Sequence, residues 1–105
     1  MPSFAENLSQ LPSIDHLSAL ELLDEQGAVV ATIPNQPGKA GSLRLYAALV
    51  AEYGALTPAA AEKGLTLFAE HTADAQQHPG SHPNIDRLIE LIATGRSLQA
   101  RLIAA

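Results

Sequence analysis

Two histidine–proline pairs, His78-Pro79 and His82-Pro83, constrain the fold more than any other feature of the sequence. A proline ring clashes with the backbone of the residue before it and pushes that residue out of the α region, so a single helix cannot run through this stretch. We therefore expect the incoming helix to stop near Gln77 and a second helix to follow, with Asn84 as its cap. Between them, Pro79-Gly80 fits the centre of a type II turn, in which glycine takes the positive φ.

Capping signals and apolar residues at helical spacing predict four helices. A short first helix begins at the capping box Ser3-Phe4-Ala5-Glu6 and ends at Pro12. Ser42 can cap the second helix, which Gly54 ends. The third helix begins with Thr57-Pro58, and its apolar stripe continues towards Gln77. The fourth helix has apolar residues at positions 85, 88, 89 and 92 and ends at Gly95.

Three segments have the composition and alternation of strands. Residues 16–23 and 28–33 flank the turn 24–27, DEQG, and predict a hairpin, and residues 98–103 alternate again near the end of the chain. A four-residue turn would pair Leu22 with Val29 and Leu20 with Ala31.

The order α-β-β-α-α-α-β predicts an α+β fold in which residues 1–105 form a single domain. Three helices return the chain parallel to the second strand, so the last strand can pair with the first in a small three-stranded sheet of order 2-1-3, packed on three helices with the short N-terminal helix beside them. Pairing of the last strand with the second is the alternative. One sheet face should hold Leu20, Leu22, Val29, Ile33, Leu98 and Leu102 against Tyr46, Phe68, Leu88 and Ile92.

Charge and composition limit the classes of binding partner and the cellular compartment that we expect for this chain. The chain has a net charge of −5, and its six basic residues are scattered singly, which disfavours nucleic acid and anionic membrane surfaces. Its N-terminus has neither a basic nor an apolar region of the kind found in signal peptides, and the sequence contains no cysteine. We therefore expect a cytoplasmic protein.

The stretch 71–86, HTADAQQHPGSHPNID, holds three of the four histidines, and we call it the histidine joint. His71 and Asp74 lie one helical turn apart, and His78 and His82 come from the turn beyond, so the four side chains could hold Zn²⁺ or Ni²⁺. The spacing matches no established metal motif. A solvated polar corner, in a protein without any cofactor, is the expected alternative, and proton transfer by His78 or His82 is a third. No residue is singled out as catalytic.

The loop 37–42, PGKAGS, lies between a strand and a helix N-terminus. Its backbone N–H groups, with Lys39, Gly41 and Ser42, could hold an anion. It is not a phosphate-binding loop of the Walker type, because the glycine spacing of that motif is absent. Plain turn and capping chemistry is the alternative.

The second face of the sheet predicts self-association. It would carry Leu17, Ala19, Leu23, Val30 and Ile103 with few charges, and a surface of this kind must be covered. Pairing of two copies in a homodimer would cover it, and so would the N-terminal helix of the same chain. An unidentified protein partner is a further possibility.

Three stretches, LPSIDHLSALELLD, NQPGKAGSLRLY and HPGSHPNIDRL, resemble a family of short, uncharacterised bacterial proteins that carry a domain of unknown function. The resemblance spans nearly the whole chain and implies a small, free-standing soluble protein, with no catalytic residue, cofactor or substrate attached. Together with the sequence pattern it favours a module that binds a partner or itself without catalysis. The alternative is a metal- or anion-dependent enzyme that uses the histidine joint.

Overall fold

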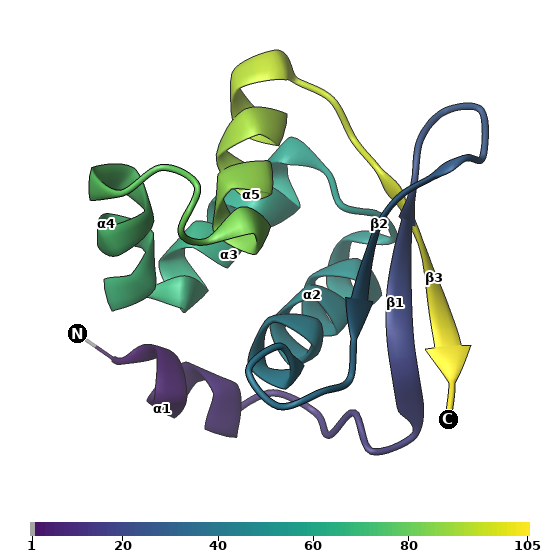
Figure 1. Cartoon of the computed structure of the whole chain (residues 1–105), viewed down its shortest axis with the longest axis horizontal. Coiled ribbons are helices and arrows are strands. Elements are labelled where there is room, and N and C mark those ends of the chain that lie inside the picture. Colours follow the sequence, from purple (N-terminus) through teal and green to yellow (C-terminus); the bar gives the residue numbers. More distant parts are fainter. Residues whose placement is uncertain (1) are drawn as a thin grey trace.

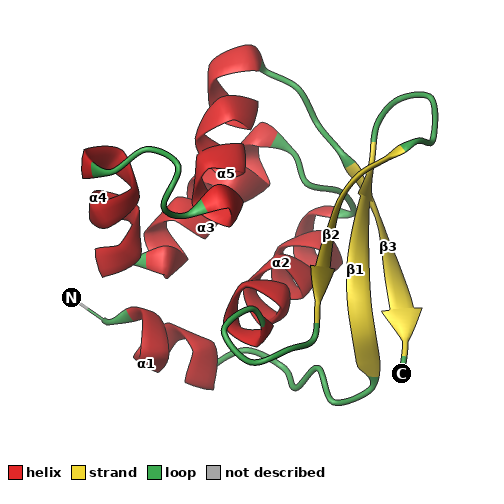
Figure 2. Cartoon of the chain, in the orientation of Figure 1, coloured by secondary structure: helices red, strands yellow, loops and turns green. Residues whose placement is uncertain are grey.

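A three-stranded antiparallel sheet and a group of helices on one side of it make up the fold (Figures 1 and 2). The computed structural model describes residues 2–105. The central strand β1 (Leu17–Leu23) pairs with β2 (Val29–Pro34) on one side and with β3 (Gln99–Ala104) on the other. The predicted α+β class and strand order 2-1-3 are confirmed.

Within residues 2–105, five helices pack around one hydrophobic core. They are α1 (Phe4–Ser9), α2 (Ala40–Tyr53), α3 (Pro58–Phe68), α4 (Glu70–Gln77) and α5 (Pro83–Thr94). Helix α2 packs on β1 and β2, α3 packs on α2 and α5, and α1 packs on α3 and α2. Gly64 permits the central crossing, since a Cβ atom there would lie 2.7 Å from Leu88 Cδ1 and 2.9 Å from Leu49 Cδ1. Among residues 2–105, the helices are all too short or too polar to cross a bilayer.

The predicted third helix is in fact two helices, broken at Ala69. This residue has φ 52° and ψ −117°, a conformation that is strained for a side chain with a Cβ atom. Its N–H group donates to the Thr66 carbonyl, and the Thr72 hydroxyl donates to the Leu65 carbonyl across the break. The break lets Phe68 remain in the core while α4 turns away from the axis of α3.

The predicted hairpin register was wrong, because the turn is shorter than expected and a bulge follows it. Gly27, at φ 81°, closes a tight turn in which its N–H donates to the Asp24 carbonyl. Leu23 then lies opposite Val29, and the register shifts between Leu22 and Leu23. The resulting pairs are Leu20 with Ile33 and Leu22 with Ala31.

These shifts change which side chains are buried. Val29, expected in the core, is 46% exposed, and Leu17, expected on the outer face, is buried beside a second irregularity between β1 and β3. Leu102 is also 46% exposed, although it lies opposite the fully buried Leu20. The remaining predicted core residues lie inside or against the core: Leu20, Leu22, Ile33, Tyr46, Phe68, Leu88, Ile92 and Leu98.

Candidate functional site

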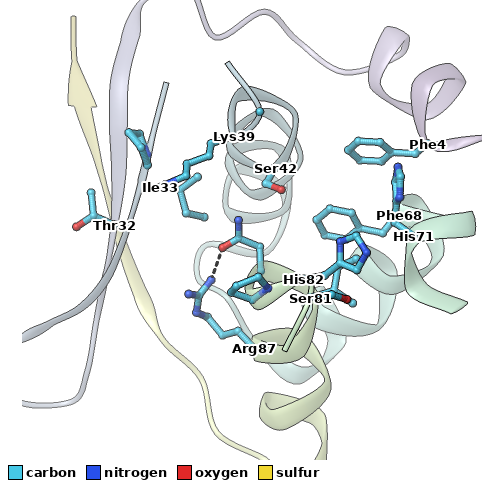
Figure 3. A pocket seen from close by; sticks show the side chains of 15 residues that line it. Phe4, Thr32, Ile33, Lys39, Ser42, Phe68, His71, Ser81, His82 and Arg87 are labelled. Atoms are coloured by element: carbon cyan, nitrogen blue, oxygen red, sulfur yellow. Dashed lines mark hydrogen bonds between the residues drawn. The ribbon is translucent and has the colours of Figure 1, made fainter. Parts of the chain in front are cut away.

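A cavity of about 470 Å³ opens between β2, the start of α2 and the histidine joint (Figure 3). It brings together side chains that are far apart in the sequence, from Phe4 near the N-terminus to Arg87 on α5. The lining residues are Phe4, Thr32, Ile33, Pro34, Gly38, Lys39, Ser42, Phe68, His71, Ser81, His82, Pro83, Asn84, Ile85 and Arg87. Its size is that of a small-molecule site.

The cavity is positively charged although the chain as a whole is negative. Lys39 and Arg87 both line it, and the lining contains neither Asp nor Glu among the residues that the structure describes. Elsewhere Lys63 pairs with Glu52 and Arg101 pairs with Glu21, whereas no carboxylate in the described chain lies within 4.0 Å of Lys39 or Arg87. The cavity therefore offers two basic groups to an incoming anion.

Arg87 is held in place by neutral groups. Its Nη1 donates to the Tyr46 hydroxyl at 3.1 Å and to Asn84 Oδ1 at 2.9 Å, and its guanidinium lies 5.8 Å from the centre of the Tyr46 ring. The Tyr46 hydroxyl donates in turn to the Asn84 carbonyl. Burial raises the pKa of Tyr46 to about 12, although the neighbouring Arg87 charge acts in the opposite direction. Tyr46 is thus a neutral hydrogen-bonding group at neutral pH, and it leaves the guanidinium charge uncompensated.

The histidine joint is organised by Asp74. Its carboxylate accepts from His82 Nε2 at 2.6 Å and from His78 Nδ1 at 3.2 Å. The hydrogen bond from His82 is the main cause that lowers the pKa of Asp74. The turn beyond has the predicted form, since Gly80 has φ 94° and Ser81 N–H donates to the His78 carbonyl.

Aromatic rings form one wall of the cavity, which we call the aromatic wall: Phe4, Phe68, His71 and His82 (Figure 3). Phe4 stacks on Phe68 with ring centres 5.3 Å apart and meets His71 edge-on at 5.0 Å. His71 lies 5.7 Å from His82. Phe4 and Phe68, distant from each other in the sequence, thus stack directly, and the two histidines extend the wall from Phe4.

The predicted anion site is brought together in part. Lys39 and Ser42 line the cavity, but Gly41 faces α1, where a Cβ atom would lie 3.3 Å from both Phe4 and Leu8. Ser42 is not the helix cap: α2 begins at Ala40 with Lys39 as its N-cap, and Lys39 makes no side-chain capping bond. The helix starts early because the Gln36 carbonyl accepts from the N–H groups of Lys39 and Ala40.

The predicted metal ligands are divided between two places. His71 and His82 line the cavity, whereas Asp74 joins His82 to the exposed His78. Within residues 2–105, no group of three or more His, Cys, Asp or Glu side chains is placed to hold a metal ion. Metal binding by these four residues stays a hypothesis beside the expected solvated corner without a cofactor. The predicted cap of the last helix was wrong, because α5 begins at Pro83 after His82, and the Asn84 side chain accepts from Arg87 instead.

Sequence reasoning did not place Arg87, Asn84 or the two phenylalanines in a functional site. Arg87 lies on α5 three residues beyond Asn84, a spacing that places the two side chains together on one helix face. That signal was present in the sequence. Phe4 meets Phe68 only through the packing of α1 on α3, so their pairing had no local signal.

The fold and the cavity define a small α+β domain with a basic pocket walled by aromatic rings. The chain belongs to DUF2322, a family of uncharacterized proteins conserved in bacteria, which matches residues 4–102. The predicted family resemblance is thereby confirmed. No curated protein and no solved structure matches the chain.

Proposed function

We propose that this protein is a binding domain for a small organic anion, which occupies the cavity between Lys39 and Arg87 and undergoes no reaction there. The observation that carries the proposal is the Arg87 guanidinium, which is partly buried and is positioned by two neutral acceptors, Tyr46 and Asn84. Charged groups taken out of water are normally paired, because desolvation of an unpaired charge is costly. A carboxylate or phosphate of the ligand would supply the missing partner.

The start of α2 adds to this preference. Lys39, the N-cap, and Ser42 both line the cavity, so the positive end of the helix dipole lies beside it. The net charge of −5 supports a small anion in place of nucleic acid, because the net negative charge of the chain would repel a polyanion. The absence of cysteine is compatible with the reducing cytoplasm, where we propose that the protein acts.

A titration followed by backbone amide NMR tests the proposal, with sodium acetate, succinate and inorganic phosphate as probes. We expect saturable shifts at residues 38–42 and 84–87. Arg87→Gln should weaken the binding by about 10-fold or more, since hydrogen bonds to charged groups contribute about 1.5–3 kcal/mol. The exposed Arg96, outside the lining residues, gives the matched control Arg96→Gln. Equal losses in both variants, or no saturable shift with any of the probes, would contradict the proposal.

We also propose that two copies pair through the outer face of the sheet. This face carries Ala19, Glu21, Leu23 and their strand partners, including Val29, Arg101 and Ile103. The N-terminal helix does not cover it, because α1 packs on α2 and α3. Arg101 Nη2 lies 2.6 Å from Glu21 Oε1, so the face presents one acid beside one base, and a two-fold axis would place each opposite its complement in the other copy.

Light scattering at micromolar concentration tests the pairing. We expect a dimer mass that Val29→Glu reduces to the monomer, because Val29 lies on the outer face and is 46% exposed. His78→Ala, at an exposed site on the histidine joint, should leave the dimer intact. A monomer mass for the unmodified chain would overturn this second proposal.

A further inference from the structure

We infer that the anion bound in the cavity carries an aromatic ring, which lies against the aromatic wall while the charged group meets Lys39 and Arg87. This inference rests on the proposed function and specifies the chemical class of its ligand. Figure 3 shows the two parts of the site: Lys39 and Arg87 lie on one side, and Phe4, Phe68 and His71 lie on the other. A ligand that uses both parts must itself have a charged part and a flat apolar part.

The volume of the site supports a ligand larger than an inorganic ion. A cavity of about 470 Å³ lies within the range of small-molecule pockets. An acetate or phosphate ion could satisfy Arg87, but it would leave Phe4 and His71, partly exposed rings of the aromatic wall, in contact with water. An aromatic ring would remove that apolar surface from water and would also meet the rings in the edge-to-face or offset geometry that aromatic groups prefer.

The aromatic wall is fixed in place before any ligand arrives. Phe4 N–H donates to Glu70 Oε1 at 2.8 Å, and this bond is the main cause that lowers the pKa of Glu70. Asn7 Nδ2 donates to the Leu67 carbonyl at 2.9 Å, so α1 is tied to α3 and α4 at two points. Phe68 is only 3% exposed. A preformed wall favours binding because little side-chain freedom is lost when the ligand enters.

His82 adds an oriented polar edge to the wall. Its Nε2 is engaged by Asp74 at 2.6 Å, and within residues 2–105 its Nδ1 makes no hydrogen bond. The Asp74 contact therefore fixes the plane of the imidazole ring without occupying its second nitrogen. This arrangement suits a ring stacked or edge-packed beside His82 better than a flexible aliphatic chain, which would gain nothing from a fixed plane.

The test compares benzoate with cyclohexanecarboxylate, which has the same charge and nearly the same size but no aromatic ring. Calorimetric titration should show benzoate binding roughly three- to tenfold more tightly, the difference expected when aromatic contacts add to simple burial. Phe4→Leu should remove most of that preference. Tyr53→Leu, an exposed aromatic outside the lining residues, is the matched control and should keep the preference.

The outcomes separate this inference from the function on which it rests. If benzoate and cyclohexanecarboxylate bind equally, and both depend on Arg87, the aromatic class is wrong and the anion site stands. If none of these anions binds, both proposals fail. Should Phe4→Leu fail to fold, His71→Leu replaces another ring of the wall at a partly exposed position and must reduce the preference for benzoate in the same way.

Discussion

The Nη1 atom of Arg87 lies 3.1 Å from the hydroxyl oxygen of Tyr46, whose ring is fully buried in the core. The same hydroxyl donates to the Asn84 carbonyl at the start of α5. One buried residue of α2 therefore fixes both the beginning of α5 and the direction of the basic group that enters the cavity. Core packing and site geometry are linked through this single oxygen atom.

Replacing Tyr46 by phenylalanine should make the protein less sensitive to alkaline pH. Burial raises the pKa of Tyr46 from 10.0 to about 12 in the native state. The protonated hydroxyl therefore makes its full contribution to the free energy of unfolding below pH 10, and this contribution is lost as the pH rises towards 12. We expect the free energy of unfolding of the native chain to fall by on the order of 2 kcal/mol over that window, and Tyr46→Phe to show a smaller fall. Urea denaturation at several pH values measures it. Tyr53→Phe, at an exposed ring, is the control and should show the same fall in the free energy of unfolding with pH as the native chain.

Ala69→Gly should stabilise the protein by about 0.5–1 kcal/mol, although glycine is the poorer helix former. The reason is the φ of 52° at this position, which glycine adopts without strain. Ala73→Gly is the matched control, because Ala73 is exposed within α4 and should lose about 1 kcal/mol. Thermal or urea unfolding of both variants decides the matter, and a loss of stability in both would show that the break at Ala69 is not strained.

Gly64→Ala should destabilise the protein by about 1–3 kcal/mol, against the helix propensity of alanine. A Cβ atom here would contact both Leu49 and Leu88 at less than 3.0 Å, and these leucines are buried with little room to move. Gly41→Ala is the comparison variant, because its Cβ atom would lie 3.3 Å from the nearest side-chain atoms. It should lower the free energy of unfolding, measured in urea, by less than Gly64→Ala does. An increase in stability for Gly64→Ala would mean that α3 and α5 separate easily.

Leu22→Ala and Leu102→Ala together test which leucines of the sheet are buried in the core. Leu22 is fully buried opposite Ala31, so its truncation should cost about 2–5 kcal/mol through lost burial and the cavity left behind. Leu102 is 46% exposed, and its truncation should cost less than about 1.5 kcal/mol. Equal losses in urea unfolding would place Leu102 in the core, as the sequence pattern had predicted.

The sequence predicted the elements and the sheet order well, since these depend on local signals. The capping box at Ser3, the Thr57-Pro58 start and the terminal glycines all lie where the structure has helix ends. The break at Ala69 carried no such signal, because alanine is the best helix former and neither glycine nor proline adjoins it. At this position the packing of α4 outweighs the helix propensity of alanine.

The candidate site was predicted only in part, because its halves come from distant segments. Lys39, Ser42, His71 and His82 were singled out from their local context, and the fold brings all four to one cavity. Nothing local to Arg87 shows that it faces these residues. Its position depends on the packing of α5 against α3 and on the hydrogen bond to Tyr46 of α2, tertiary contacts that hydrophobic periodicity does not specify.

The pairing of β1 with β3 also governs how the chain reaches its native state. Glu21 and Arg101, joined across these strands, are 80 residues apart in the sequence. The central strand must therefore close a long loop before it gains its second neighbour, and sheets built on such distant pairs fold over roughly milliseconds or longer. Until then the apolar strand with Leu20 and Leu22 has an open hydrogen-bonding edge, which another chain could extend. A chain cut before Gln99 would keep that edge permanently and should aggregate.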